Sequence, residues 1–435
     1  MSESLGRRSV PADEAEFLAD MQEASTIGAT PGGGVQRLSL SVEDGQARDW
    51  LARWLRQRGF SIKVDAIGNM FGVLDWRPGA PYVLCGSHLD SQPRGGRLDG
   101  AYGVVAAAHA ADRLRRQVKA SGEMPAFNVA VVNWTNEEGA RFRPSLLGSS
   151  VYSGAMALDD ALAVRDGAGM SAAEALAVIG YAGQDSAPWP PAAYAEVHIE
   201  QGRVLEEADR TIGLVVSNWA AYKYEIEVTG RQAHTGPTRM AERKDALLGA
   251  AHLIVAARKL VEQLAPRPLH TSVARLTTSP NSPNSVTSQA TLFLELRSPD
   301  PQVLAEAEKI LSETILQVQQ TTGVEIAYGQ AVRRGVLRFD ADGIELARTS
   351  AHALGLDYLE LATIAGQDAI AISAIAPSVL LFVPSSEGIG HHEEEYTPDS
   401  LLASGVDMLT ELLTRLCVGE LGGSATGNFT APAAV

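Results

Sequence analysis

Residues 81–90, PYVLCGSHLD, and residues 101–117, AYGVVAAAHAADRLRRQ, decide the fold class of this 435-residue chain. The first stretch is an apolar run that leads into a polar loop, which is typical of a strand buried on both faces of a sheet. The second stretch predicts the helix that follows this strand. The buried-strand pattern returns at residues 127–139 and 193–202. Strands that alternate with helices indicate an α/β fold with a central, mostly parallel sheet flanked by helices.

Residues 14–60 precede the first buried strand and predict two amphipathic helices, joined by the Gly-rich loop TPGGGVQRLSLS (30–41). In the second helix, apolar side chains recur at helical spacing. They are Ala47, Trp50, Leu51 and Trp54.

The middle of the chain follows a different pattern. In residues 222–229, YKYEIEVT, apolar and polar side chains alternate, which predicts a strand with one face in water and is typical of an antiparallel sheet. A helix at 243–263, an alternating strand at 290–297, a helix at 301–321 and a strand at 323–329 follow. This succession favours the β-α-β-β-α-β order of a ferredoxin-like α+β two-layer sandwich.

Residues 378–385, SVLLFVPS, return to the buried-strand pattern. The sandwich is therefore expected to be an insertion, residues 214–330, within an α/β domain made of residues 1–213 and 331–418. The remaining residues, 419–435, are small and polar and are expected to be disordered.

Composition excludes several classes of protein. An apolar fraction of 45% and a charged fraction of 20% are ordinary for a globular chain. Lys and Arg number 36 against 52 Asp and Glu, and a net charge of −16 argues against nucleic acid as a partner. Neither a membrane-spanning run nor a secretory signal is recognised, so no membrane partner is expected. Two cysteines, Cys85 and Cys417, cannot build a disulfide framework, which favours a reducing, cytoplasmic location.

Residue types that bind metals gather where the four predicted buried strands end. They are His88 and Asp99, then Glu137 and Glu138, then His198 and Glu200, and finally His391 and His392. In open α/β sheets the ligand crevice lies at the carboxyl ends of the strands, so these four segments meet at one edge. Imidazole and carboxylate groups suit zinc, manganese or cobalt. Any one of these segments alone would fit a surface histidine or a charged loop. The occurrence of such residues at all four strand ends is not expected from chance and favours a metal site.

The number of candidate ligands favours two ions. A mononuclear catalytic zinc site commonly uses three protein ligands, and more candidates than that are present here. A carboxylate such as Asp99 can bridge two ions about 3.5–4 Å apart, with a hydroxide held between them. A spare carboxylate, either Glu137 or Glu138, can then serve as the general base.

A set of motifs is spread along the chain: GGVQRLSLS (33–41), GSHLDSQPRGGRLDGAYG (86–103), TNEEGARF (135–142), HIEQGRVLE (198–206), AHTGPTRMAERKDA (233–246), NSVT (284–287), LELRSPD (294–300) and GHHEEEYT (390–397). By these motifs the sequence resembles, from about residue 15 to 415, the carbamoylase, allantoate amidohydrolase and ureidopropionase branch of the dinuclear zinc aminoacylase and carboxypeptidase family. HIEQG together with NEEGARF is highly specific for this branch.

The resemblance implies a role for individual residues. The metal ligands are expected to be His88, Asp99, Glu138, His198 and His391. Asp99 is the bridging ligand and Glu137 the general base. The family's substrate contacts fall on Gln201, His234, Asn284, Arg297 and Gln367. The cofactors are two divalent ions, zinc first, with manganese, cobalt or nickel as alternatives.

The family also implies a homodimer in which residues 214–330 form both the lid and the subunit contact, so that His234 reaches the partner's active site. This chain departs from the family pattern at three places. Gly390 stands where a serine is common, residues 215–225 lack a Gly-rich pattern, and Gln367 replaces a histidine. A glutamine cannot carry a proton at neutral pH, so the last departure concerns the substrate rather than the metals.

The expected reaction is hydrolysis of an N-carbamoyl amino acid to the amino acid, carbon dioxide and ammonia, by a metal-bridging hydroxide with Glu137 as general base. Alternatives with the same metals are an allantoate or ureidoglycolate amidohydrolase, a 3-ureidopropionase, and an N-acyl amino acid acylase. A different class is a catalytically inactive, metal-dependent binding protein. Glu137, which has no expected ligand duty, argues against that class.

Overall fold

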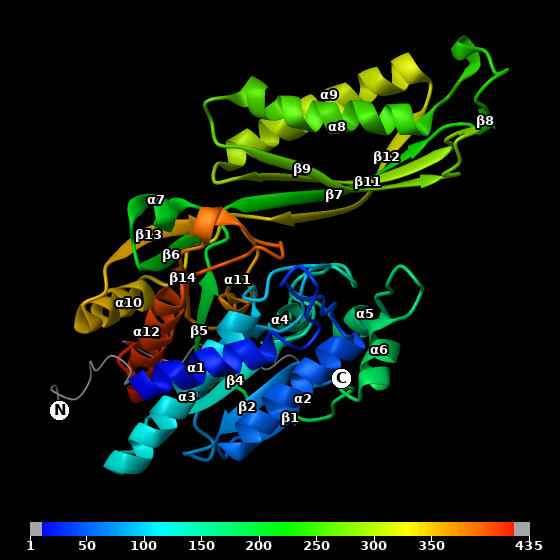
Figure 1. Ribbon diagram of the computed structural model, residues 1–435. Helices are drawn as coiled ribbons and strands as arrows, with labels where there is room; N and C mark the ends of the chain where they lie inside the picture. Colours follow the sequence, from blue (N-terminus) through cyan, green and yellow to red (C-terminus); the bar gives the residue numbers. More distant parts are fainter. Residues whose placement is uncertain (1–10, 422–435) are drawn as a thin grey trace. The chain divides into compact units, whose positions relative to one another are not determined.

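The computed structural model describes residues 11–421 and divides the chain into two compact units (Figure 1). The first unit consists of the chain up to Val216 and from Phe339 onward, and the second is Ser217–Arg338. The second unit ends later than the expected boundary at residue 330, because its last strand continues to Arg334. Residues 422–435 of the expected disordered tail lie outside the described residues.

The first unit contains an eight-stranded sheet in the order β1-β2-β4-β3-β5-β14-β6-β13. Its strands are β1 (Ser61–Val64), β2 (Met70–Leu74), β3 (Tyr82–His88), β4 (Asn128–Trp134), β5 (Pro191–Ile199), β6 (Ile212–Asn218), β13 (Tyr358–Thr363) and β14 (Ser378–Val383). The central strands β4, β3, β5 and β14 are parallel, and β1, β2 and β6 pair antiparallel. The α/β class is confirmed, with a mixed sheet whose centre is parallel.

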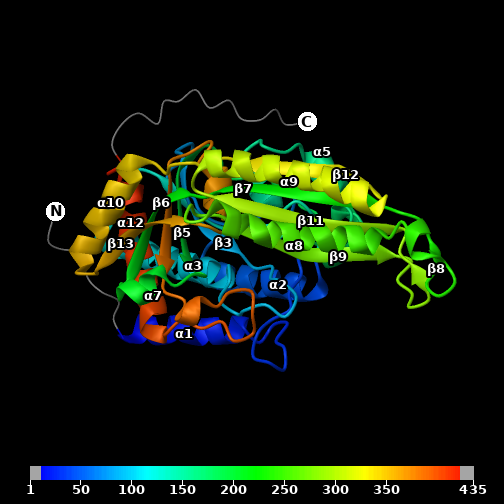
Figure 2. The ribbon, with the colours of Figure 1, turned by 90° about the horizontal axis from the view of Figure 1, so that it is seen from above.

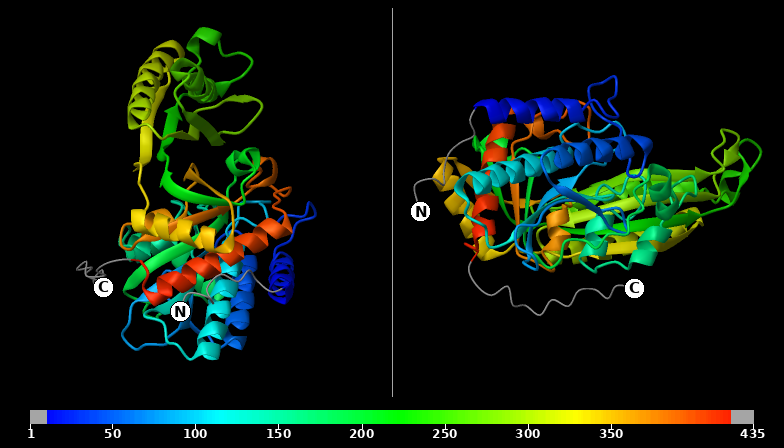
Figure 3. Two further views of the ribbon diagram at one scale, coloured as in Figure 1. Left: turned by 90° about the vertical axis from the view of Figure 1, so that its left-hand side faces the viewer. Right: turned by 90° about the horizontal axis from the view of Figure 1, so that it is seen from below.

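Helices cover the sheet of the first unit. They are α1 (Pro11–Ala24), α2 (Val42–Gln57), α3 (Ala101–Ser121), α4 (Leu147–Tyr152), α5 (Leu158–Ala163), α6 (Ala172–Ile179), α7 (Val204–Ala208), α10 (Ala341–Leu354), α11 (Asp368–Ile372) and α12 (Asp399–Val418). α3 and α12 pack against each other and against β5 (Figure 3). Every residue of α3 from Ala101 to Leu114 is buried, so the helix that follows β3 lies in the core.

One part-buried polar cluster fixes α1 to its neighbours. The Asp20 carboxylate accepts a hydrogen bond from Trp54 Nε1 at 2.7 Å and lies 2.9 Å from His109 Nε2. Burial raises the pKa of Asp20, but the hydrogen bonds to His109 and Trp54 and the nearby charges of His109 and Arg58 together outweigh burial and bring this pKa below its usual value. Because the folded pKa lies below the unfolded one, this stabilisation is present above the unfolded pKa and is lost as the pH falls through the folded pKa.

We expect Asp20→Ala to lower the free energy of unfolding by about 1–3 kcal/mol at pH 7, since it leaves two buried donors without their acceptor. The loss should shrink at the lowest pH at which the wild type stays folded. Urea unfolding at both pH values measures it, with Glu23→Ala, an exposed carboxylate on the same helix, as the control. A loss that does not depend on pH would assign the effect to packing instead.

The second unit is a two-layer sandwich. Helices α8 (Ala246–Leu264) and α9 (Pro301–Thr322) lie side by side on one face of an antiparallel sheet in the order β12-β7-β11-β9 (Figure 2). Its strands are β7 (Ala220–Thr229), β9 (His270–Ser279), β11 (Gln289–Ser298) and β12 (Glu325–Arg334), and a ribbon of β8 (Ala233–His234) and β10 (Ser285–Val286) lies beside them. Chain order and strand order match the expected ferredoxin-like sandwich.

Sequence reasoning did not place β9, the second strand of this sandwich. Its residues are exposed or half-buried throughout, so the apolar alternation that reveals β7 and β11 is missing. Within the described residues 11–421, none of the helices has the length and apolar character that crossing a membrane requires.

Candidate metal centre

Four separate segments bring the candidate ligands together in the first unit. His88 is the last residue of β3, and His198 lies one residue before the end of β5. Glu138 follows β4, Asp99 precedes α3, and His391 follows β14. They form two groups, one of His88, Asp99 and His198 and the other of Asp99, Glu138 and His391, and within each group the ligand atoms lie within 4.8 Å of one another.

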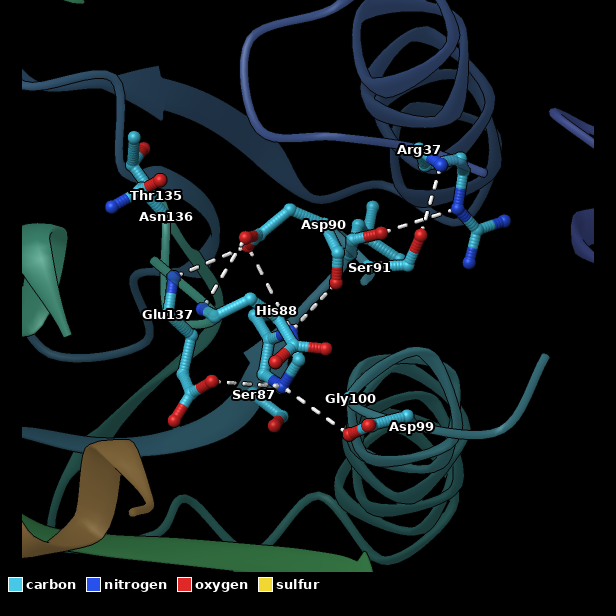
Figure 4. Close-up of polar contacts among 12 residues, drawn as sticks. Arg37, Ser87, His88, Asp90, Ser91, Asp99, Gly100, Thr135, Asn136 and Glu137 are labelled. Atoms are coloured by element: carbon cyan, nitrogen blue, oxygen red, sulfur yellow. Dashed lines mark hydrogen bonds and ion pairs between the residues drawn. The ribbon is translucent and has the colours of Figure 1, made fainter. Parts of the chain in front are cut away.

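Asp99 belongs to both groups, and each of its carboxylate oxygens faces a different one. Oδ1 lies 3.2 Å from His198 Nε2 and 3.8 Å from His88 Nε2. Oδ2 lies 3.2 Å from His391 Nε2. Figure 4 shows Asp99 on one side of the His88 ring and Glu137 on the other. This is the arrangement that a carboxylate shared by two ions requires.

The two buried imidazoles are oriented by main-chain carbonyl groups. His88 Nδ1 lies 2.9 Å from the carbonyl oxygen of Asp90, and His198 Nδ1 lies 2.9 Å from that of Ile199. A carbonyl oxygen only accepts hydrogen bonds, so Nδ1 carries the proton in both rings. Nε2 is therefore the nitrogen of each ring that faces Asp99 and is available to a metal ion.

Asp90 is a residue of the site that sequence reasoning missed. It is 2% exposed, and its carboxylate accepts hydrogen bonds from the backbone N–H groups of Glu137 and Glu138 at 3.2 and 3.4 Å. Asp90 thus fixes the loop that carries both glutamates. The available signal was its position, two residues after the histidine that ends a buried strand.

Glu137 is buried next to the first ligand group but belongs to neither group. Its Oε2 lies 3.6 Å from His88 Nε2. Burial raises the pKa of Glu137 well above its usual value, and the negative charges of Asp368 and Glu138 raise it further. A carboxyl group with a raised pKa can take a proton from water and pass it on near neutral pH.

The surrounding ligands form a charged, buried cluster. Burial raises the pKa of Glu138 to about 8, and the charge of Asp99 adds to this rise. Burial also opposes the imidazolium form of His198, but the hydrogen bond and negative charge of Asp99, together with the charge of Glu196, outweigh burial and raise the pKa of His198 to about 9. Protons and divalent cations therefore compete for these atoms.

The residues present fit two divalent ions. Their ligand atoms are imidazole nitrogens and carboxylate oxygens, the donors that zinc, manganese and cobalt accept. Oε1 of Glu138 is buried and has no hydrogen-bond partner among the described residues. A buried carboxylate oxygen without a donor is costly unless a cation satisfies it.

Other candidates at the strand ends have different surroundings. Gln201 donates from Nε2 to Asp99 Oδ2 at 2.8 Å. Glu200 caps α7 by accepting from the N–H groups that start it, and His392 is 58% exposed beside Glu394. Gln367 is 2% exposed, and its Oε1 accepts no hydrogen bond from the described residues.

The remaining candidates lie in the second unit. His234 pairs with Ser285 in the β8–β10 ribbon, which brings His234 beside Asn284. Gly236 N–H donates to His234 Nδ1 at 3.0 Å, so the ring proton is on Nε2. Arg297, on β11, forms an ion pair with Glu295 at 2.9 Å, and the two side chains are 23% and 14% exposed.

Residues 84–415 match the family described as peptidase family M20/M25/M40, and the match includes every candidate metal ligand. The chain therefore belongs to this family. Over 418 residues it is 50% identical to a protein of Mycolicibacterium smegmatis described as a hydrolase, with 95% of each chain covered. Over 394 residues it is 33% identical to the N-carbamoyl-L-amino-acid amidohydrolase of Rhizobium meliloti, covering 89% of this chain and 93% of that protein.

A solved structure is also similar along the whole chain. It is the crystal structure of an amidase of the hydantoinase/carbamoylase family from Burkholderia vietnamiensis. The two structures agree with a TM-score of 0.89 at 34% sequence identity, over 96% of this chain and 99% of that one.

Proposed function

We propose that this protein is a metal-dependent amidohydrolase that cleaves the ureido C–N bond of an N-carbamoyl amino acid, giving the amino acid, carbon dioxide and ammonia. Family membership and the likeness to a named amidohydrolase make the chain a hydrolase of C–N bonds in linear amides. The observation that carries the proposal is the pair of ligand groups that share Asp99, with the buried Glu137 beside them.

In the proposed reaction, His88, Asp99 and His198 would hold one divalent ion, and Asp99, Glu138 and His391 would hold the other. When bound, two such ions lower the pKa of a water molecule and polarise the carbamoyl oxygen. Glu137 takes a proton from the attacking water and passes it to the leaving nitrogen. Asp90 keeps Glu137 in place through the loop backbone.

His234 and Asn284 are proposed to donate hydrogen bonds to the oxyanion of the tetrahedral intermediate. The Nε2–H tautomer of His234 suits this task. One such donor is commonly worth about 3 kcal/mol of transition-state stabilisation.

A homodimer through residues 214–330 is part of this proposal. His234 and Asn284 lie beyond the Gln289 end of β11, and Arg297 lies near its other end, so at the rise of a strand they are about 27 Å apart. One small ureido substrate cannot contact both ends, so the pair from one subunit would serve its partner's site. The edge strand β9 and the exposed Leu247, Leu248 and Val255 of α8 offer a surface for the contact.

A substrate panel tests the reaction. The protein, supplied with Zn²⁺, Mn²⁺, Co²⁺ or Ni²⁺, is assayed on N-carbamoyl amino acids, 3-ureidopropionate, allantoate, ureidoglycolate and N-acyl amino acids. Ammonia and the free amino acid are both measured, because acyl substrates release no ammonia. Release of both products from N-carbamoyl amino acids supports the proposal, and turnover of acyl substrates alone overturns it.

Arg297 is proposed to bind the substrate carboxylate, because its planar guanidinium offers two parallel donors that an ammonium group cannot reproduce. We expect Arg297→Lys to lower kcat/KM by ~30-fold or more, which corresponds to about 2 kcal/mol, with metal content unchanged. An amide analogue without the carboxylate should lose much less. Arg275→Lys, at an exposed position of β9, is the control. Equal losses on both substrates would assign Arg297 a structural role, such as its ion pair with Glu295, instead of carboxylate binding.

A further inference from the structure

His391 differs from the other two histidines in how the fold holds it. His88 and His198 are 1% exposed on strands, whereas the His391 side chain is 52% exposed on a loop. The backbone of His391 has a φ of 55°, in the left-handed region. A non-glycine residue keeps this conformation only where its surroundings hold it. Some other contact must therefore position the loop that carries His391.

Glu393, two residues further along the same loop, makes that contact. Its Oε1 accepts a hydrogen bond from Thr30 Oγ1, and its Oε2 lies 2.5 Å from Arg94 Nη2. The backbone N–H of Gly32 also donates to this carboxylate. The Glu393 side chain is 11% exposed, although it lies on a surface loop.

The Gly-rich loop at residues 30–34 is shaped around Glu393. A Cβ added to Gly32 would lie 2.5 Å from the Glu393 carboxylate carbon, and one added to Gly34 would lie 2.9 Å from Glu393 Cα. A Cβ added to Gly33, between them, would meet nothing within 4 Å. Backbone hydrogen bonds between Val35 and Gly95 join this loop to the segment that carries Arg94.

The same loop also reaches the shared ligand. Glu395 is 4% exposed, and its Oε1 accepts hydrogen bonds from the backbone N–H groups of Leu98 and Asp99, both at 3.0 Å. Alternate residues of one short segment thus have three roles. His391 is a candidate metal ligand, Glu393 binds the Gly-rich loop, and Glu395 binds the backbone at Asp99.

We propose that Glu393 is a clasp that positions His391 and so sets how tightly the protein retains the ion of the Asp99, Glu138 and His391 group. The other ion, in the group of His88, Asp99 and His198, is held without it. This inference rests on the proposed two-ion centre but not on the substrate. Outer contacts that orient a metal ligand commonly change metal affinity by about 10–100-fold when they are removed.

Competition with a chelator of known affinity tests the clasp, with Zn²⁺ as the probe and the full chain as the sample. We compare Glu393→Gln and Arg94→Gln with Glu394→Gln. The last variant makes the same charge change at an exposed neighbour and serves as the matched control. One of the two bound Zn²⁺ ions, assigned to the Asp99, Glu138 and His391 group, should lose affinity at least ~10-fold in Glu393→Gln and less in Arg94→Gln. The affinity of the other Zn²⁺ ion should change by less than about twofold, and Glu394→Gln should match the wild type for both ions.

Three outcomes overturn the clasp. They are equal effects of Glu393→Gln and Glu394→Gln, equal weakening of the binding of both ions, and binding of a single ion by the wild type. Arg94 is 70% exposed, so its variant is expected to fold even if Glu393→Gln does not. If Glu393→Gln does not fold, a variant Arg94→Gln that binds both Zn²⁺ ions with wild-type affinity also overturns the proposal. Metal retention is measured without substrate, so a failed ureidohydrolase assay leaves this result standing.

Discussion

Glu137→Gln is expected to lower turnover of an N-carbamoyl amino acid at least ~10³-fold while the protein keeps its full metal content. General-base catalysis typically contributes about 10²–10⁴-fold, and the amide of glutamine cannot take a proton from water. Metal should remain because Glu137 belongs to neither ligand group. Steady-state kinetics and metal analysis of the same preparation measure both quantities.

Glu138→Gln is the matched comparison, since it makes the same change one residue away in a residue of the second group. It should lose metal as well as turnover. Turnover of Glu137→Gln near the wild-type rate would remove Glu137 as the base. A wild type that binds metal but turns over none of the panel would revive the alternative of a metal-dependent binding protein.

The second large effect is expected for Asp99→Ala, because Asp99 is the one residue common to both groups. The variant should retain less than one ion per chain and show no turnover above background. Chelation of the wild type should have the same effect on activity, reversed by adding Zn²⁺, Mn²⁺ or Co²⁺. Metal analysis after dialysis and kinetics before and after chelation measure these outcomes.

Glu200→Gln is the control for Asp99→Ala. It removes a carboxylate close to His198 that caps α7 and belongs to neither group. Its metal content should equal that of the wild type. If Asp99→Ala kept two ions, the shared-ligand geometry would be wrong, and a wild-type rate unaffected by chelation would exclude the metal mechanism.

The buried strands could be predicted because a strand covered on both faces needs a continuous apolar run, and β3, β4, β5 and β14 each have one. The ligand cluster could be predicted because parallel strands end at a common edge. Choosing His391 over His392 needed the family resemblance, since either histidine fits the spacing. β9 carries no such pattern because it buries too little apolar surface.

The supports of the site could not be predicted for a different reason. Asp90 and Glu395 act through hydrogen bonds to backbone N–H groups, and every residue except proline offers one. The segment that donates these hydrogen bonds can have any sequence without proline at the donor positions. The contact therefore leaves no pattern of residue types and is seen only in the folded chain. The Gly-rich loop was visible in the sequence, but its contact with Glu393 joins residues more than 350 positions apart.

The chain enters and leaves the second unit at one place. Ser217 and Arg338 form a backbone bridge there, and Phe339 N–H donates to the Val216 carbonyl oxygen at 3.1 Å. The chain thus returns to the first unit where it left it. The inserted unit contributes no strand to the eight-stranded sheet and none of the proposed metal ligands. If Arg297 binds the substrate carboxylate and His234 and Asn284 stabilise the oxyanion as proposed, these three contacts and the metal ligands are encoded in separate stretches of sequence. Evolution can then change which amide is accepted while every residue that holds an ion stays the same.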